Sequence, residues 1–552
     1  MIVMDSVDVA IVGSGAGGGP LAMRLTEAGF RVAVLEKGPR YARSDFLQDE
    51  LLSCDDFGLF VPSPTEEPHV IVRSDGTTEL SSLGWIACCW GGGTCHMGAA
   101  LYRFHPADFM MRSQFGDHYN IADWPYRYAD LERYYAQAES VLGVSGATSG
   151  TPLEEFRSKP LPMPPLTAHP TAAVFEKVCS DLGSHAFPTP RGINSIPYDD
   201  RPACADCNWC SGYGCPTGAR GSAQETVLLK AERTGRCRVM VGCMVREIIV
   251  DSRGLASGCI YFDSDRIERK LSAKAICISC SAVESARLLL LSHSRLFPDG
   301  LGNGSGQVGK NLQFLSTSSG CGRLMGKRNL QDLAAPINNL GRSVVDYYFL
   351  PQGVSSLAKG GLLQFDLVRP SPIATAQKIA GTGSGTPLWG DALKARLRNY
   401  FLDGREIGFE VFHDFIPSDG TYVDLDPHVC DKWGLPVARI HVSLVEHHFA
   451  AGKWLLDRGL EILNALGAED LETLSHALIG RHLIHGTCRA GLNKTTSMLN
   501  QFCQSHEVRN LFVVDGSFMP TSAGVPTTLT IVANSLRTAD YIVAEARAGN
   551  LE

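Results

Sequence analysis

The chain has 552 residues and a formal charge of −8, with 44% hydrophobic and 20% charged residues. This composition is typical of a folded globular protein and excludes a disordered or low-complexity chain. The mild acidity argues against a nucleic-acid-binding protein, because no basic stripe is available to neutralise phosphates. No apolar stretch reaches the ~18 residues that a membrane-spanning helix requires, so we expect no membrane span.

Glycine and cysteine are both abundant, with 57 and 18 residues. The N-terminal segment 1–8 lacks the basic and apolar regions of a signal peptide, which predicts a cytoplasmic protein. Export together with a signal-bearing partner subunit stays open. In a reducing compartment, clustered cysteines more often bind metal or stay reduced than form disulfides.

The first motif lies between two predicted strands. An apolar segment at 9–12 is followed by a glycine-rich turn, a helix and a second strand that ends in Glu36. Gly13 permits the tight turn, Gly15 lets the backbone approach a pyrophosphate, and Gly18 lets the helix pack on the strand. The helix N-terminus would bind the phosphates and Glu36 the ribose hydroxyls. The motif predicts a dinucleotide site without distinguishing FAD from NAD.

The remaining motifs extend over nearly the whole chain. They occupy 90–96, 103–109, 123–146, 485–491 and 510–531. In this order they resemble the motifs of the glucose–methanol–choline (GMC) family of flavin oxidoreductases. They are most similar to the branch of gluconate, fructose and sorbitol dehydrogenase large subunits. The resemblance implies an α/β fold, in which a Rossmann-like FAD-binding domain accompanies a substrate domain made of a sheet and helices.

The same resemblance implies that the FAD-binding domain is discontinuous. We expect it to consist of residues 1–125, 200–320 and 480–552. Residues 126–199 would form a connecting or lid region. Residues 320–480 would form the substrate-binding domain, in which 404–413 has strand-like alternation.

The resemblance also favours FAD over NAD. It implies that the turn from Gly13 to Gly18 and Glu36 hold the ADP half of the cofactor. It further implies that a second glycine loop passes the isoalloxazine ring, that a strand valine contacts the adenine, and that a later turn covers the pyrophosphate. These residues are Gly92, Gly93, Thr94, Val245, Asp515 and Gly516. The alternatives are a plain structural turn for the glycine loop and an ordinary core residue for Val245.

The family reaction oxidises a CH–OH group. A base takes the hydroxyl proton while hydride passes to flavin N5, and a histidine suits the base. Many relatives place a histidine three residues before a Gly-Thr pair, a position that Leu483 occupies here. His485 lies one residue before the glycine and His482 four before it. We favour His485 as the base, although either histidine could be purely structural.

The second catalytic position departs from the family pattern. Relatives have Asn or His where this chain has Pro526, and the adjacent Thr527 could supply only a hydroxyl. A distant histidine could take the missing role, and His413, His447 and His448 are candidates. The departure also leaves open a non-oxidative, lyase-type flavoenzyme and an FAD oxidase.

Four cysteines form a second constellation. Cys204, Cys207, Cys210 and Cys215 have the spacing C-x2-C-x2-C-x4-C, which is similar to iron–sulfur ligation. The resemblance implies a three-iron cluster on Cys204, Cys210 and Cys215, with Cys207 displaced or extra. Zinc and a reduced structural loop are the alternatives. A cluster would give electrons a one-electron exit from the flavin.

The sequence therefore predicts an FAD-dependent oxidoreductase that oxidises a sugar or alcohol and passes electrons to an acceptor other than oxygen. We expect a small-molecule substrate and an electron-transfer or small-subunit partner, and no nucleic acid. A further alternative is a redox subunit whose catalysis requires its partner.

Overall fold

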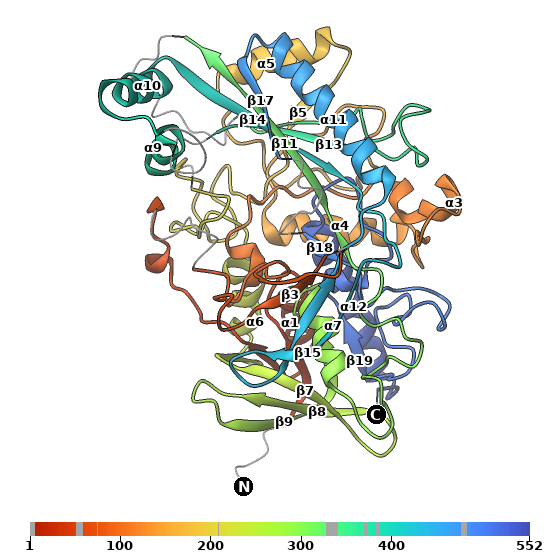
Figure 1. The fold of residues 1–552 in the computed structure, drawn as a ribbon. Helices are drawn as coiled ribbons and strands as arrows, with labels where there is room; N and C mark the ends of the chain where they lie inside the picture. The colour runs from red at the N-terminus through yellow and green to blue at the C-terminus, as the bar shows by residue number, and fades with distance from the viewer. Residues whose placement is uncertain are drawn as a thin grey trace.

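The structure is a computed structural model that describes residues 6–50, 59–73, 75–207, 209–326, 340–368, 372–381, 387–475 and 483–551. Two large sheets dominate it, one in the lower half of Figure 1 near both termini and one in the upper half. None of the helices within these ranges is long and apolar enough to cross a membrane.

The lower sheet has seven strands, in the order β6-β2-β1-β9-β8-β7, with β19 also paired to β9. The pairs around β1 are parallel, whereas β7, β8 and β9 pair in antiparallel fashion. Its strands are β1 (Ser6–Val12), β2 (Val32–Glu36), β6 (Cys237–Val241), β7 (Met244–Val250), β8 (Ala256–Phe262), β9 (Glu268–Ile278) and β19 (Leu511–Val513).

The core of this sheet follows from its apolar runs. The strands β1 and β2 consist largely of valine, alanine, isoleucine and leucine, and their centres are buried. Such continuous runs suit parallel strands that helices cover on both faces. The covering helices include α1 (Gly18–Glu27) and α7 (Ala282–Leu291). Helix α12 (Thr528–Arg547) packs against α1, and α4 (Tyr128–Leu142) packs against α12.

The upper sheet has six strands, all paired in antiparallel fashion, in the order β17-β11-β14-β13-β12-β5. Helix α11 (Glu446–Ala465) packs on one of its faces, with α5 (Thr171–Asp181) beside it (Figure 1). The strands are β5 (Ala186–Pro188), β11 (Ser316–Met325), β12 (Arg342–Val344), β13 (Gly361–Leu367), β14 (Gly404–His413) and β17 (Glu469–Ser475).

Two smaller sheets accompany the large ones. In the first, β3 (His69–Val72) pairs with β4 (Thr78–Ser81) and, in parallel, with β16 (Pro436–His441). The fourth strand, β15 (Tyr422–Cys430), pairs with β16. This sheet therefore joins the stretch expected to bind substrate to the first 125 residues.

The second small sheet pairs β10 (Gln313–Phe314) with β18 (Ile484–His485), which brings His485 beside the start of β11. The remaining helical elements are η1 (Arg43–Asp45), η3 (Gly92–Cys95), η4 (Pro106–Met110), α3 (Met111–Phe115), η5 (Gln224–Leu228), α6 (Leu229–Arg233), α9 (Pro372–Ala380), α10 (Gly390–Leu402) and η7 (Gly516–Phe518).

A buried ion cluster ties the upper sheet to the 103–109 motif. The Lys359 ammonium, just before β13, lies 2.7 Å from an Asp414 oxygen and 3.1 Å from an Asp108 oxygen. All three side chains are at most 1% exposed. The Tyr348 hydroxyl donates a hydrogen bond of 2.7 Å to Asp108. Burial raises the pKa of Asp414 to about 7 in spite of the neighbouring ammonium.

We expect Lys359→Met to lower the free energy of unfolding by about 3–5 kcal/mol, because it leaves two buried carboxyl groups without their cation. Thermal and chemical denaturation would measure the loss. The control is Lys177→Met, which removes an exposed ammonium paired with Asp181 and should change stability by less than about 0.5 kcal/mol. Equal effects of the two substitutions would contradict this role of the cluster.

Candidate active site

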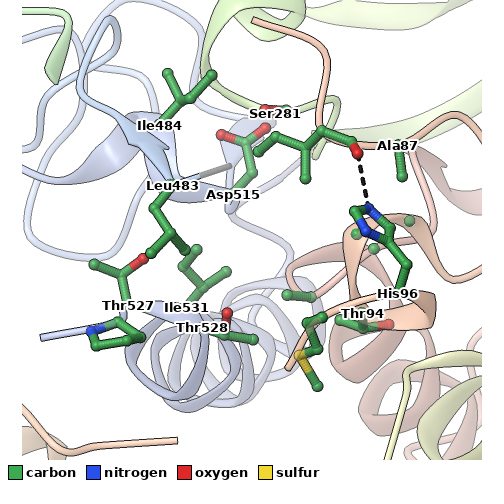
Figure 2. A pocket seen from close by; sticks show the side chains of 18 of the residues that line it. Ala87, Thr94, His96, Ser281, Leu483, Ile484, Asp515, Thr527, Thr528 and Ile531 are labelled. Atoms are coloured by element: carbon green, nitrogen blue, oxygen red, sulfur yellow. Dashed lines mark hydrogen bonds between the residues drawn. The ribbon is translucent and has the colours of Figure 1, made fainter. Parts of the chain in front are cut away.

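A cavity of about 900 Å³ is lined by residues of both large sheets. Figure 2 shows two of its sides, with Leu483, Thr527, Thr528 and Ile531 on one and Thr94 and His96 on the other. The residues of the sequence prediction that line it are Gly13, Gly15, Glu36, Gly92, Gly93, Thr94, Val245, Cys210, His485, Asp515, Gly516 and Thr527.

The turn after β1 depends on contacts that exclude side chains. Gly13 has φ +96°, and a Cβ there would lie 2.1 Å from the carbonyl oxygen of Ser279. A Cβ at Gly18, the first residue of α1, would lie 2.0 Å from the Gly13 carbonyl oxygen. A Cβ at Gly15 would approach only Gly92, at 3.8 Å. Gly13 and Gly18 therefore shape the turn, while the Gly15 backbone borders the open cavity.

Glu36 ends β2 and is almost fully buried. Its carboxylate accepts hydrogen bonds from the Ser14 amide at 3.2 Å, the Ser14 hydroxyl at 2.7 Å and the Gly38 amide at 3.0 Å. Burial raises the pKa of Glu36, although these three hydrogen bonds act to lower it. The Ser14 hydroxyl in turn accepts a hydrogen bond of 2.9 Å from the Gly91 amide, which ties the first glycine turn to the second.

The second glycine loop lies against the first. Gly91 and Gly92 have positive φ, and a Cβ at Gly92 would lie 2.9 Å from the Cα of Gly15. The Thr94 hydroxyl donates to the Gly91 carbonyl at 2.6 Å and accepts from the Ala223 amide at 2.8 Å. The loop therefore approaches the dinucleotide turn backbone to backbone, as its glycines indicate.

The residues at this end fit a dinucleotide. The N-terminus of α1, Glu36 and Asp515 supply amide groups and carboxylates for phosphates and hydroxyls. Asp515 accepts hydrogen bonds from the Ser517 amide at 2.8 Å and from the Ser285 hydroxyl. Two buried hydroxyls of the cavity wall, Ser279 and Ser281, have no hydrogen-bond partner within the described chain. A bound ligand would satisfy them.

Val245 lines the cavity from the second residue of β7. Residues 242–243 separate β7 from β6, so Val245 lies in a different strand from residues 237–241. β6 pairs with β2, whereas β7 pairs with β8.

At the opposite end, His485 and Thr527 form a buried pair. The Nε2 of His485 lies 2.7 Å from the Thr527 hydroxyl oxygen, and each residue is 1% exposed. The Nδ1 of His485 has no hydrogen-bond partner among the described residues. Burial lowers the pKa of His485 to about 3, so its imidazole is neutral at physiological pH. Gly516 lies behind the ring, where a Cβ would come within 3.2 Å of His485 Cδ2.

Apolar residues occupy the two usual catalytic positions. Leu483 and Pro526 both line the cavity, and Figure 2 places Leu483 beside Thr527. His482 lies outside the described residues.

The other histidine candidates do not reach the site. His413, His447 and His448 are buried, and none of them is among the described residues that line the cavity. The His448 ring accepts a hydrogen bond of 2.7 Å from the Ile416 amide, and His447 pairs with the Ser355 hydroxyl at 2.9 Å. These contacts indicate structural roles for both residues.

Of the four cysteines of this segment, Cys210 alone lines the cavity, together with the neighbouring Ser211 and Gly212. Among the described residues, which omit Asn208 of this segment, no three or more His, Cys, Asp or Glu side chains are arranged to hold a metal ion. No disulfide joins any two of the described cysteines. Burial alone would raise the pKa of Cys215, but Arg220 and a hydrogen bond to Thr217 bring it below its usual value. The described thiols therefore do not fit a preformed cluster site.

The upper sheet contributes a polar wall that the sequence prediction did not assign. Arg191 donates to both oxygens of Asp366, at 2.8 and 2.9 Å, and Gln364 donates to Asp366 at 3.1 Å. Glu410 lines the same wall from β14. The alternation at 404–413 was the available signal, because it predicts that every second residue of this strand shares a face.

Comparison with known proteins identifies the family. A model described as FAD binding domain matches residues 8–44, and two models described as GMC oxidoreductase match residues 87–315 and 417–535. The chain belongs to the GMC oxidoreductase family. The predicted family, α/β fold and FAD cofactor are therefore confirmed.

The GMC oxidoreductase has relatives along its whole length. It is 29% identical to a 2-methyl-1,2-propanediol dehydrogenase of Mycolicibacterium austroafricanum, with 98% of this chain and 95% of that one covered. It is 27% identical to a fructose dehydrogenase large subunit of Gluconobacter japonicus, with 99% of each chain covered. A solved pyridoxine 4-oxidase from Mesorbium loti shares the fold, with a TM-score of 0.61, 16% identity and coverage of 97% and 98%.

As a member of this family, the chain is an FAD-dependent oxidoreductase acting on CH–OH groups. These redox relatives favour oxidation over the lyase-type alternative.

We expect Gly13→Ala to abolish most FAD retention, because the new Cβ would strike the Ser279 carbonyl oxygen that shapes the turn. The ratio of flavin to protein absorbance after purification measures the loss. Gly29→Ala is the matched control, since Gly29 has φ +98° but no atom within 4 Å of its Cβ position. The Gly29→Ala variant should lose only about 1–3 kcal/mol of stability through backbone strain, and it should keep its flavin. Flavin loss in both variants would contradict the steric argument.

Proposed function

We propose that this GMC oxidoreductase is a dehydrogenase that oxidises a polar alcohol or sugar and passes electrons to an acceptor other than oxygen. The observation that carries this proposal is the continuity of one cavity from the dinucleotide turn to a wall of polar side chains on the upper sheet. The names of two relatives, 2-methyl-1,2-propanediol dehydrogenase and fructose dehydrogenase large subunit, support it.

We propose the corresponding division into domains and partners. Residues 1–125, 200–320 and 480–552 bind FAD, 126–199 connect, and 320–480 bind substrate. A small or electron-transfer subunit would accept the electrons, as the name of the fructose dehydrogenase large subunit suggests. Reduced thiols are compatible with the cytoplasm, where we expect the protein to act.

Each end of the cavity has its own task in the proposed reaction. FAD, when bound, supplies the hydride acceptor. Gly13, Gly15 and Glu36 hold the dinucleotide half, while the upper sheet positions the carbinol. Leu483 and Pro526 add apolar side chains to the cavity wall in which Thr527 lies.

We propose that His485 and Thr527 together take the carbinol proton. As hydride leaves the carbinol carbon, the Thr527 oxygen accepts the hydroxyl proton and passes its own proton to Nε2 of His485. The distance of 2.7 Å between these atoms permits the transfer, and the neutral imidazole has a lone pair available for it. Thr527 would then provide the polar group that the family pattern lacks at Pro526.

For the cysteine segment we propose a structural role. Arg220 donates hydrogen bonds to the carbonyl oxygens of Cys95, Tyr213 and Cys210, which fixes the segment against the second glycine loop. We assign the cysteines no role in electron transfer, because the described thiols are not grouped as the ligands of a metal cluster would be.

We expect Thr527→Val to lower kcat by about 100-fold or more, because the carbinol proton loses its path to His485. Steady-state kinetics with an artificial electron acceptor would measure the change. At saturating substrate, a plot of wild-type kcat against pH should show no acid limb near pH 6.5, since the pKa of His485 is about 3.

The matched control is Thr530→Val, in the first turn of helix α12, whose N-cap residue is Thr527. The Thr530 hydroxyl bonds to the Tyr135 hydroxyl at 2.8 Å, and it does not line the cavity. It should cost about 1 kcal/mol of stability with kcat nearly unchanged. A kcat of the Thr527→Val variant that is comparable to that of the wild type would refute the proton path.

Quantifying flavin, iron and electron acceptors on one purified sample tests the remaining parts. We expect one flavin per chain and far less than one iron, with turnover supported by a quinone or dye and little peroxide formed in air. Rapid peroxide formation would instead identify an oxidase. About three irons per flavin would overturn the structural role of the cysteines and restore the predicted cluster.

A further inference from the structure

Three adjacent strands present one polar face to the cavity. In the register of the upper sheet, Glu410 on β14 lies opposite Ser319 on β11 and Gln364 on β13. All three residues line the cavity. The alternate residues of the same strands, such as Leu363 and Val411, belong to the hydrophobic cluster beneath α11. The alternation of the strands therefore fixes Glu410 on the side that faces the ligand.

Most of the polar groups on this face already satisfy one another. Asp366 receives two hydrogen bonds from Arg191 and one from Gln364. The Gln364 carbonyl oxygen accepts a hydrogen bond of 3.1 Å from the Tyr102 hydroxyl. The negative charge of Asp366 is thus balanced by the guanidinium of Arg191.

Glu410 stands outside this network. Within the described residues its carboxylate makes no hydrogen bond and no ion pair, and the Ser319 hydroxyl opposite it also has no partner. The side chain is accessible only because the cavity in front of it is open. The surrounding protein still desolvates it, which raises the pKa of the Glu410 carboxyl to about 7, with Asp366 adding to this effect and Arg191 opposing it.

We propose that Glu410 is the anchor for a protonated amine of the substrate, so that the preferred substrates are amino alcohols or amino sugars. This inference rests on the proposed oxidation of a CH–OH group in the same cavity. The carboxylate and the Ser319 hydroxyl supply adjacent acceptors, which match an ammonium group with its three donors. A neutral polyol would leave the surplus negative charge of this wall unbalanced.

The register also separates the anchor from the proton-accepting pair. His413, at the end of β14, pairs with Ser316 near the β10–β18 contact that carries His485. Glu410 lies three residues earlier on β14, roughly 10 Å along the strand. The substrate should therefore carry its amine several bonds away from the carbinol that reacts.

The test compares two molecules of equal length, 6-amino-1-hexanol and 1,6-hexanediol. Titration of the FAD-loaded enzyme, followed by flavin absorbance and by calorimetry, gives Kd for each. At pH 8 we expect the amine to bind at least about tenfold more tightly than the diol. Glu410→Gln should make the two Kd values equal.

The matched control is Glu406→Gln. Glu406 lies on the same strand but outside the cavity lining, and it accepts a hydrogen bond of 2.6 Å from the Tyr400 hydroxyl. Its loss should leave the preference for the amine intact. Ser319→Lys offers a second route, because the new ammonium opposite Glu410 should abolish the preference while the carboxylate remains.

The preference should also depend on pH. The charged and polar groups that face Glu410 are Asp366 and Gln364 on β13 and Ser319 on β11. Arg191, which is hydrogen-bonded to Asp366, also acts on Glu410. Since Glu410 must be ionised to pair with the amine, binding should strengthen as pH rises through about 7. The diol should show no such trend.

Equal binding of amine and diol by the wild type would overturn the inference, as would a preference that survives in Glu410→Gln. An equal loss of turnover with both compounds, without a change in relative affinity, would place Glu410 in the reaction instead. A failure of the proposed function would give a different result. In that case the amine would still bind in a Glu410-dependent manner, but no alcohol would reduce the flavin under anaerobic conditions.

Discussion

The hydroxyl of Ser14 holds together the two loops between which a dinucleotide must lie. It donates to the Glu36 carboxylate and accepts from the Gly91 amide, so a single oxygen connects the end of β2, the turn after β1 and the second glycine loop. The glycines around it allow this approach, because a Cβ at Gly92 would come within 2.9 Å of Gly15. The contact between the two glycine loops therefore sets the position of the cavity wall that they form.

Buried charge is handled differently at each end of the molecule. Lys359 and its two aspartates neutralise one another inside the protein. Glu36 is surrounded by hydrogen-bond donors. Glu410 borders the open cavity and has neither kind of compensation among the described residues, so a ligand that fills the cavity must supply the missing charge. This contrast distinguishes a residue that stabilises the fold from one that is available for binding.

Local patterns were sufficient for much of the fold. The apolar segment at 9–12, the strand ending at Glu36 and the strand at 404–413 all form as predicted, because their periodicity and flanking glycines are encoded in consecutive residues. The glycine turns could be predicted for the same reason.

Long-range features could not be predicted in this way. The separation of Val245 from the strand at 237–241 depends on how β7 pairs with β8. The burial of His485 depends on its pairing with Gln313, far away in the chain. The unpaired state of Glu410 depends on the register of β11, β13 and β14. It also depends on Arg191, which pairs with Asp366 and not with Glu410. Residue type alone carries none of this information.

The pairing of β3 with β16 places part of the expected substrate domain in the flavin half. These strands come from opposite sides of the expected domain boundary, yet they share backbone hydrogen bonds in one sheet. Helix α7, which also packs against β7 of the lower sheet, contacts both β15 and β16. The chain therefore passes from the upper sheet at β14 to the flavin half at β15 and β16 and returns at α11, so neither half is encoded by one continuous segment.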